Sequence, residues 1–290
     1  MNAKVLAIVA VAVVVVAAAG AGAFFLLKNK DKEPDADYTL LDSNDNIKVG
    51  MTIVTDTDAE SMTSHAKYVV NAVANGKVTY SMKSETSGDT VLATFADFMP
   101  TGFLTEFPFD YTDSSDIPSG VTVTHNGNVY TIDGSFKENN PPMVVEYTFD
   151  DLEINYNGTA VTAVDGKMKA VSTFGGTVEK ADYKFVTKDG VLGGTTNEEF
   201  ENPSVQVAIA DFYSDVLMTY NADTYAPATI TSAAGTYGGV DVTVYTINGT
   251  DADGDTYENV NISVYKGFML HGEGKMNGEK ASQTTKIYIA

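Results

Sequence analysis

Residues 130–135 read Tyr-Thr-Ile-Asp-Gly-Ser, and residues 245–250 repeat this pattern as Tyr-Thr-Ile-Asn-Gly-Thr. In each copy apolar and polar residues alternate, and an Asx-Gly pair follows. Alternation with a period of two is typical of a half-buried β-strand, and Asp-Gly or Asn-Gly is a strong signal for a tight turn or a strand end. The stretch therefore predicts antiparallel strands joined by short turns.

The same signal punctuates the chain from residue 47 onward. Further Asx-Gly pairs begin at Asn75, Asn126, Asn157, Asp165 and Asp189, with runs rich in Val, Thr, Tyr and Ile between them. We expect hairpin turns or strand ends at these pairs and a body that is mainly antiparallel β-sheet.

The two copies belong to a longer internal repeat. Ala-Asp-Phe occurs at 96–98 and again at 210–212, and Gly-Lys-Met occurs at 166–168 and again at 274–276, in the same order. We therefore predict two tandem related β-rich units. The first covers residues 47–164, and the second covers residues 165–290 and includes a closing hairpin.

Two segments break the β pattern with apolar residues at helical spacing, one around residues 91–99 and one around residues 209–220. For the second helix, Asn202 is expected to accept the free amides of the first turn, and Pro203 suits the first helical position. Each helix would cover one face of its sheet. The predicted fold class is thus α+β, mainly antiparallel β, with a helix plus four or more strands in each unit and shared hairpins.

The N-terminus carries an unbroken run of 23 apolar or glycine residues, Val5–Leu27. As a helix it would reach about 34 Å, enough to cross a hydrocarbon core of about 30 Å. We predict an N-terminal stub (1–4), a single transmembrane helix (5–27) and a polar linker (28–46). A cleaved signal peptide ending near Ala21 is the alternative, but the apolar run continues through Phe24 to Leu27.

The side of the membrane is argued from charge and from glycosylation acceptors. Lysines just after the span slightly favour a cytoplasmic body by the positive-inside rule. The strongly acidic body and three Asn-x-Ser/Thr acceptors, Asn157, Asn248 and Asn261, favour export. We predict a single-pass cell-membrane protein with an extracytoplasmic body.

Composition excludes several functions. The net charge is −21, all 18 basic residues are Lys, and the chain has no Cys and no Trp. Nucleic-acid and nucleotide binding are therefore not expected, because both depend on basic groups that neutralise phosphate. Disulfides and thiolate chemistry are impossible. No catalytic or cofactor motif is found, so we expect no enzyme and no cofactor.

Two segments could form a binding site. Asp251, Asp253, Asp255 and Glu258 place carboxylates at alternate positions of one loop, which could hold Ca²⁺, although the glycine spacing excludes an EF-hand. The alternative is a solvated hairpin loop.

The second segment is rich in phenylalanine, with Phe95, Phe98, Phe103, Phe107 and Phe109. It could form an apolar mouth for a lipid or a peptide, or it could fold into the core.

These features predict a membrane-anchored surface protein with a structural, adhesive or ligand-presenting role. The partner would be an unidentified protein, glycan or lipid. The alternative is an extracytoplasmic carrier or sensor that binds an apolar ligand between a helix and a curved sheet.

Overall fold

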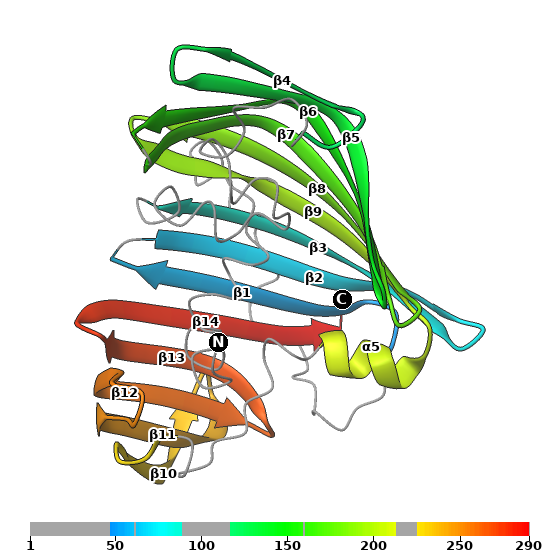
Figure 1. Ribbon diagram of the computed structural model, residues 1–290. Coiled ribbons are helices and arrows are strands. Elements are labelled where there is room, and N and C mark those ends of the chain that lie inside the picture. Colours follow the sequence, from blue (N-terminus) through cyan, green and yellow to red (C-terminus); the bar gives the residue numbers. More distant parts are fainter. Residues whose placement is uncertain (1–46, 61, 89–116, 159, 213–224, 290) are drawn as a thin grey trace.

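The computed structural model describes residues 47–60, 62–88, 117–158, 160–212 and 225–289. These residues form one twisted, curved sheet of 14 antiparallel strands, in the order β10-β11-β12-β13-β14-β1-β2-β3-β9-β8-β7-β6-β5-β4 (Figure 1). The strands are β1 (Met51–Ala59), β2 (Met62–Ala74), β3 (Lys77–Gly88), β4 (Val121–Asn126), β5 (Val129–Asn140), β6 (Met143–Asn157), β7 (Ala160–Phe174), β8 (Thr177–Lys188), β9 (Val191–Asn202), β10 (Thr229–Tyr237), β11 (Val240–Thr250), β12 (Thr256–Tyr265), β13 (Phe268–Met276) and β14 (Glu279–Ile289). The helix in this part of the chain is α5 (Val205–Phe212).

The predicted α+β fold class is wrong. The described residues are nearly all antiparallel β, and they do not form two helix-plus-strand units. The reason is that β3 and β9 pair along their whole length, from Val78 opposite Asn202 to Gly88 opposite Leu192, so all strands join one sheet. The first predicted helix, around residues 91–99, lies outside the described residues.

The helix α5 begins later than the sequence predicted. Asn202 is still the last residue of β9, where it is fully buried and its Oδ1 accepts a hydrogen bond of 3.0 Å from Thr177 Oγ1. The amide of Val207 instead donates to Ser204 Oγ at 3.2 Å. Ser204 is therefore the N-cap residue, because the strand continues through Asn202 and leaves the next free hydroxyl to cap the helix.

The sheet has two halves, and in each half the strands follow the chain order from the outer edge toward the middle. Strands β4 to β9 follow in chain order from one edge, and β10 to β14 follow from the other. The N-terminal strand β1 pairs with the C-terminal strand β14, with Met51 opposite Ile289. The described ends of the chain therefore lie side by side in the middle of the sheet, so the closing hairpin β13–β14 pairs with β1.

The Asx-Gly pairs divide into two structural classes. The pairs at Asn75, Asn126, Asn157 and Asp189 lie at turns between strands, as predicted. The remaining three pairs, which begin at Asp133, Asp165 and Asn248, lie inside β5, β7 and β11. There the expected strand end is wrong, and the strand continues through a local irregularity.

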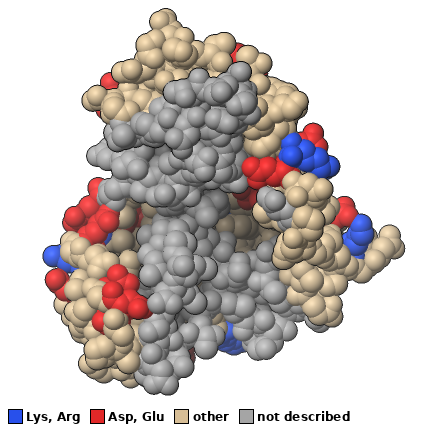
Figure 2. Space-filling view, in the orientation of Figure 1, with Lys and Arg blue, Asp and Glu red and all other residues tan. Residues whose placement is uncertain are grey.

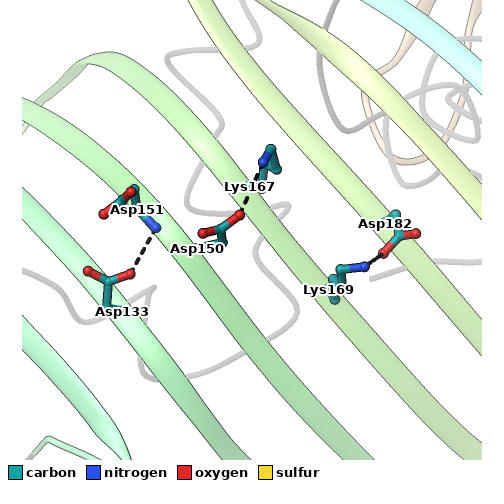
Figure 3. A network of polar contacts seen from close by, with 6 residues as sticks. All are labelled: Asp133, Asp150, Asp151, Lys167, Lys169 and Asp182. Carbon is teal, nitrogen blue, oxygen red and sulfur yellow. Dashed lines mark hydrogen bonds and ion pairs between the residues drawn. The ribbon is translucent and has the colours of Figure 1, made fainter.

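At each of these three sites the Asx side chain accepts a hydrogen bond from a backbone amide of a neighbouring strand. Asp133 Oδ1 accepts from the amide of Asp151 at 2.9 Å, and Asn248 Oδ1 accepts from the amide of Asn259 at 2.8 Å. Asp165 Oδ1 accepts from the amide of Thr187 at 3.0 Å. The following glycine adopts a positive φ, which lets the strand bulge without steric strain. Figure 3 shows the first of these contacts.

The bulges recur at equivalent places in the two halves. The β5–β6 pairing shifts between Ile132 and Gly134, and the β11–β12 pairing shifts between Ile247 and Gly249. The β6–β7 pairing shifts twice along β6, at 150/153 and at 155/156, and the β12–β13 pairing shifts twice along β12, at 258/261 and at 263/264. The sequence repeat therefore corresponds to a repeated set of backbone irregularities.

One face of the sheet, here named the buried face, carries the apolar core in three clusters. The first is built mainly on β5 to β9, the second mainly on β1 to β3 with α5, and a smaller third one on β11 to β13. In the second cluster the Phe212 ring of α5 packs edge-on against Tyr80 of β3, which stacks on Phe200 of β9. The helix therefore covers the apolar part of β3 and β9.

The opposite face, here named the exposed face, is more open, although Thr52 and Val54 of β1 are buried on it, and it carries paired charges. Lys167 Nζ lies 3.1 Å from Asp150 Oδ2, and Lys169 Nζ lies 3.0 Å from Asp182 Oδ1 (Figure 3). In the view of Figure 2 the charged side chains of the described residues lie mainly around the rim of the molecule. Within the described part of the chain, no helix is long and apolar enough to cross a membrane. The predicted span, residues 5–27, lies outside that part.

Candidate functional site

A band of polar side chains crosses the buried face in the middle of the sheet. We name it the polar band, and each of its residues is buried. Its members are Thr55 and Thr57 of β1, Ser64 of β2, Ser84 and Thr86 of β3, Thr196 and Glu198 of β9, and Gln283 and Thr285 of β14. Buried polar groups normally have hydrogen-bond partners, so their grouping here requires an explanation.

The strand register brings these residues into two parallel rows. In the first row Gln283 lies opposite Thr57, Thr57 opposite Ser64, and Ser64 opposite Thr86. With strands about 4.8 Å apart, this row spans about 14 Å.

The second row lies two residues further along each strand. Thr285 lies opposite Thr55 and Ser84 lies opposite Thr196, with Ala66 between the two pairs. Side chains two residues apart share a face, so the two rows form one continuous patch.

Three oxygen atoms of the polar band have no hydrogen-bond partner. They are Thr57 Oγ1, Gln283 Oε1 and Thr285 Oγ1, and they lie on the neighbouring strands β1 and β14. Elsewhere in the band partners are present, as where Thr86 Oγ1 donates to Ser64 Oγ at 3.1 Å. A buried polar atom without a partner costs about 1–3 kcal/mol. The polar band is therefore incompletely satisfied at its β1–β14 end.

Apolar residues border the polar band on the same strands. On β2 the buried residue before Ser64 is Met62, which belongs to the first cluster. The buried residues after Ser64 are Ala66, Tyr68 and Val70, which belong to the second cluster. The band therefore lies between two apolar surfaces.

The electrostatic environment of the polar band is not cationic. Side chains alternate between faces, so Lys67 of β2 and Lys83 of β3 project on the exposed face. At the β9 end, burial raises the pKa of Tyr183, and the neighbouring Glu198 and Glu179 raise it further. Tyr183 therefore stays a neutral hydroxyl group. Such a site suits an uncharged hydrogen-bonding group rather than an anion.

The predicted Ca²⁺ loop is placed at the turn between β11 and β12, and its carboxylates already have protein partners. Asp251 Oδ1 accepts from the amides of Asp253 and Asp255, each at 3.0 Å, and the buried Tyr257 hydroxyl donates to Asp251 Oδ2 at 2.9 Å. Glu258 Oε2 lies 3.8 Å from Lys275 Nζ. These contacts brace the turn, and the Ca²⁺ prediction itself stays a prediction.

The predicted glycosylation acceptors lie in three different settings. Asn157 is exposed at the end of β6, beside the turn to β7. Asn248 is exposed but its Oδ1 accepts from Asn259, and Asn261 is half-buried and accepts from Thr246 Oγ1 at 2.8 Å. Asn157 and Asn248 are thus more accessible than Asn261. Residues Phe95, Phe98, Phe103, Phe107 and Phe109 of the predicted apolar mouth lie outside the described residues.

Sequence reasoning missed the polar band because its residues look like solvent-facing positions. Residues 83–87 read Lys-Ser-Glu-Thr-Ser, which predicts a solvated strand, yet β3 lies in the middle of the sheet. The available signal was that the residues on both faces of this segment are polar. That pattern excludes an ordinary half-apolar strand but does not say which face is buried.

Comparison with known proteins gives no relative for this chain. No protein-family model, no curated protein and no solved structure matches it.

Proposed function

We propose that the protein is a single-pass membrane protein with an extracytoplasmic body that holds an uncharged amphiphilic molecule on the buried face of its sheet. Its role is ligand-presenting and non-enzymatic. The apolar run Val5–Leu27 and the exposed acceptor Asn157 support the membrane anchor and the export of the body. The polar band supports the ligand.

The three unpartnered oxygens of the polar band carry this proposal. Valine has the shape of threonine without the hydroxyl, so valine at positions 57 and 285 would remove two desolvation costs at nearly constant volume. The chain keeps the costly hydroxyls instead. A ligand whose hydroxyl or amide group pairs with them explains why they are retained.

The surroundings define the two parts of this ligand. The polar part meets neutral oxygens on β1 and β14, and Lys67 and Lys83 project on the other face, so an anionic head group gains no cationic partner from them. The apolar part lies against the clusters that border the band. This description also fits the carrier or sensor alternative, which differs in what happens to the ligand afterwards.

The binding test uses the full chain in lipid nanodiscs with 1-monooleoylglycerol as the probe and oleate as its charged counterpart. We expect native mass spectrometry to show retained monooleoylglycerol on the unmodified chain and at least about tenfold less on the double variant Thr57→Val/Thr285→Val. Without probe, the double variant should melt a few degrees higher, because two buried hydroxyls are gone.

The matched control is Thr63→Val, on the exposed side of β2. It should bind the probe like the unmodified chain. Equal retention of monooleoylglycerol by the unmodified chain and the double variant would exclude the polar band as the binding site.

The side of the membrane on which the body lies is tested separately, with a cysteine at position 63. The chain has no cysteine, so Thr63→Cys introduces a single exposed thiol. A membrane-impermeant maleimide should label this variant on intact cells. Labelling that occurs only after lysis would place the body inside the cell.

A further inference from the structure

The outer strand β10 is paired on one side only. It pairs with β11 without any register shift, from Thr229 opposite Asn248 to Tyr237 opposite Val240. Among the described strands none pairs with its other edge, because β10 is the first strand in the sheet order. An unpaired edge offers a row of free backbone amides and carbonyls to another strand.

The chemistry of β10 does not protect this edge. Its nine residues, Thr-Ile-Thr-Ser-Ala-Ala-Gly-Thr-Tyr, include no charged residue and no proline. Successive residues of a strand point to opposite faces, yet the run Thr231–Ala234 is exposed throughout, so both faces of β10 are open there. Charge, proline, bulges and short length are the usual devices against edge pairing, and β10 has none of them.

We propose that β10 pairs antiparallel with β10 of a second copy of this chain and so forms a symmetric dimer. A twofold axis at Ala233 would place Ala233 opposite its own copy, Ser232 opposite Ala234, and Thr231 opposite Gly235. Small uncharged side chains then meet on both faces of the joined sheet. This contact is independent of the ligand on the buried face.

Charge favours β10 as the place where two copies meet. Each chain has a net charge of −21, so two copies repel one another over most of their surfaces. Like charges placed opposite each other across strands are destabilising, and β10 has none. Salt screens the repulsion between the bodies but does not weaken backbone hydrogen bonds in the same way. The dimer should therefore strengthen as the salt concentration rises.

The other open edge fits β10 less well. Strand β4 has six residues, against nine in β10, so pairing β4 of one copy with β10 of the next would leave part of β10 uncovered. That contact is also head-to-tail and would produce rings or open chains of molecules. Pairing β10 with itself covers the whole strand and closes after two copies.

Cysteine cross-linking of the full chain in isolated membranes tests the dimer, because the natural chain has no cysteine. We expect Ala233→Cys to form a disulfide-linked dimer under mild oxidation at least about tenfold faster than the exposed control Thr63→Cys, and faster at high salt. A rate equal to that of the control overturns the proposal. Faster linkage between Ala233→Cys and Thr124→Cys copies overturns it in favour of β4–β10 chains.

A charge exchange at the twofold axis tests the register without a disulfide. Ala233→Lys and Ala233→Glu each place like charges opposite each other, so neither variant should dimerise alone. Mixing copies of the two variants should restore the dimer, as measured by co-purification through two different tags. Co-purification of either variant with itself, at the level of the natural chain, overturns the proposal.

Discussion

Strands β6 and β7 each have 15 residues, whereas their counterparts in the other half, β12 and β13, have 10 and 9. The apolar clusters of the two halves differ similarly, with 12 buried residues on β5 to β9 and 5 on β11 to β13. The bulges nevertheless occur at the same places in both halves. Strand length can therefore change freely by adding residue pairs in register, but the bulge positions do not change.

The bulge glycines show why these positions are restricted. A Cβ on Gly166 would lie 2.2 Å from the backbone oxygen of Asp151, and a Cβ on Gly274 would lie 2.5 Å from the Cα of Val260. Both contacts are with backbone, which cannot move aside as a flexible side chain can. Close approach of neighbouring strands at the bulge thus requires glycine in both halves.

The largest expected effect comes from filling these sites. Gly166→Ala and Gly274→Ala should each lower the free energy of unfolding by more than about 3 kcal/mol, because a methyl group meets backbone and φ is positive. Urea unfolding of the full chain, followed by circular dichroism, measures both. The control is Gly190→Ala, which also has a positive φ but whose Cβ meets nothing within 4 Å, and it should cost about 1 kcal/mol.

The result for Gly274→Ala tests whether the smaller half requires glycine at its bulge as the larger half does. If Gly274→Ala costs no more than Gly190→Ala, the smaller half adapts to the methyl group, and the bulge is not a shared requirement.

The second prediction concerns alkaline pH, because both halves bury tyrosines. Burial raises the pKa of Tyr147, Tyr156 and Tyr183 in one half. In the other half burial raises the pKa of Tyr257, and it raises the pKa of Tyr225 to about 12 with help from Asp251. Folding therefore favours the neutral phenol. The resulting stability is complete below about pH 10 and is lost as the pH rises toward the folded pKa values.

Above about pH 10 each such tyrosine should contribute up to about 1.4 kcal/mol of lost stability per pH unit. Above about pH 10, Tyr225→Phe should remove the contribution of one tyrosine from the slope of unfolding free energy against pH. The double variant Tyr147→Phe/Tyr183→Phe should remove the contributions of two. Urea unfolding at several pH values between 9 and 11 measures the slope. An unchanged slope in the double variant would mean that these phenols ionise as easily in the folded chain as in the unfolded one.

The third prediction addresses the Asx side chains at the bulges. Asp133→Ala and Asn248→Ala each remove the acceptor for a neighbouring backbone amide, and each should cost about 1–2 kcal/mol. The exchanges Asp133→Asn and Asn248→Asp keep the accepting oxygen and should stay within about 0.5 kcal/mol of the natural chain. A large cost for these exchanges would show that charge, rather than the hydrogen bond, matters at the bulge.

The sequence predicted the strands well but not how they combine. Alternation and turn signals locate the antiparallel strands, and the pairs at Asn75 and Asp189 do lie at turns. The Asp-Gly pair at Asp133 has the same local sequence signal but lies inside β5. There the alternation of apolar and polar residues continues on both sides of the pair, through Phe136. Continuation of the strand pattern beyond the glycine was the signal that distinguishes a bulge from a turn.

The joining of all strands into one sheet could not be predicted in the same way. It depends on the pairing of β3 with β9, which lie far apart in the chain, and local patterns carry no information on distant partners. The polar band was hidden for the same reason. Thr57 and Gln283 look like surface residues until β1 and β14 are paired, and only their pairing shows that these side chains share a buried face.

The smallest expected effect concerns an ion pair that recurs in both halves. Lys167 lies 3.1 Å from Asp150, and Lys275 lies 3.8 Å from Glu258 at the equivalent positions beside the bulge. All four side chains are about half exposed or more, so a double-mutant cycle with alanine should give a coupling of no more than about 0.5 kcal/mol for either pair, and less at high salt. A coupling above about 1 kcal/mol in one half alone would show that the halves have diverged in how they hold the bulge. Weak coupling in both would mean that these charges recur because the strand register repeats, while glycine and the Asx acceptor provide the stability.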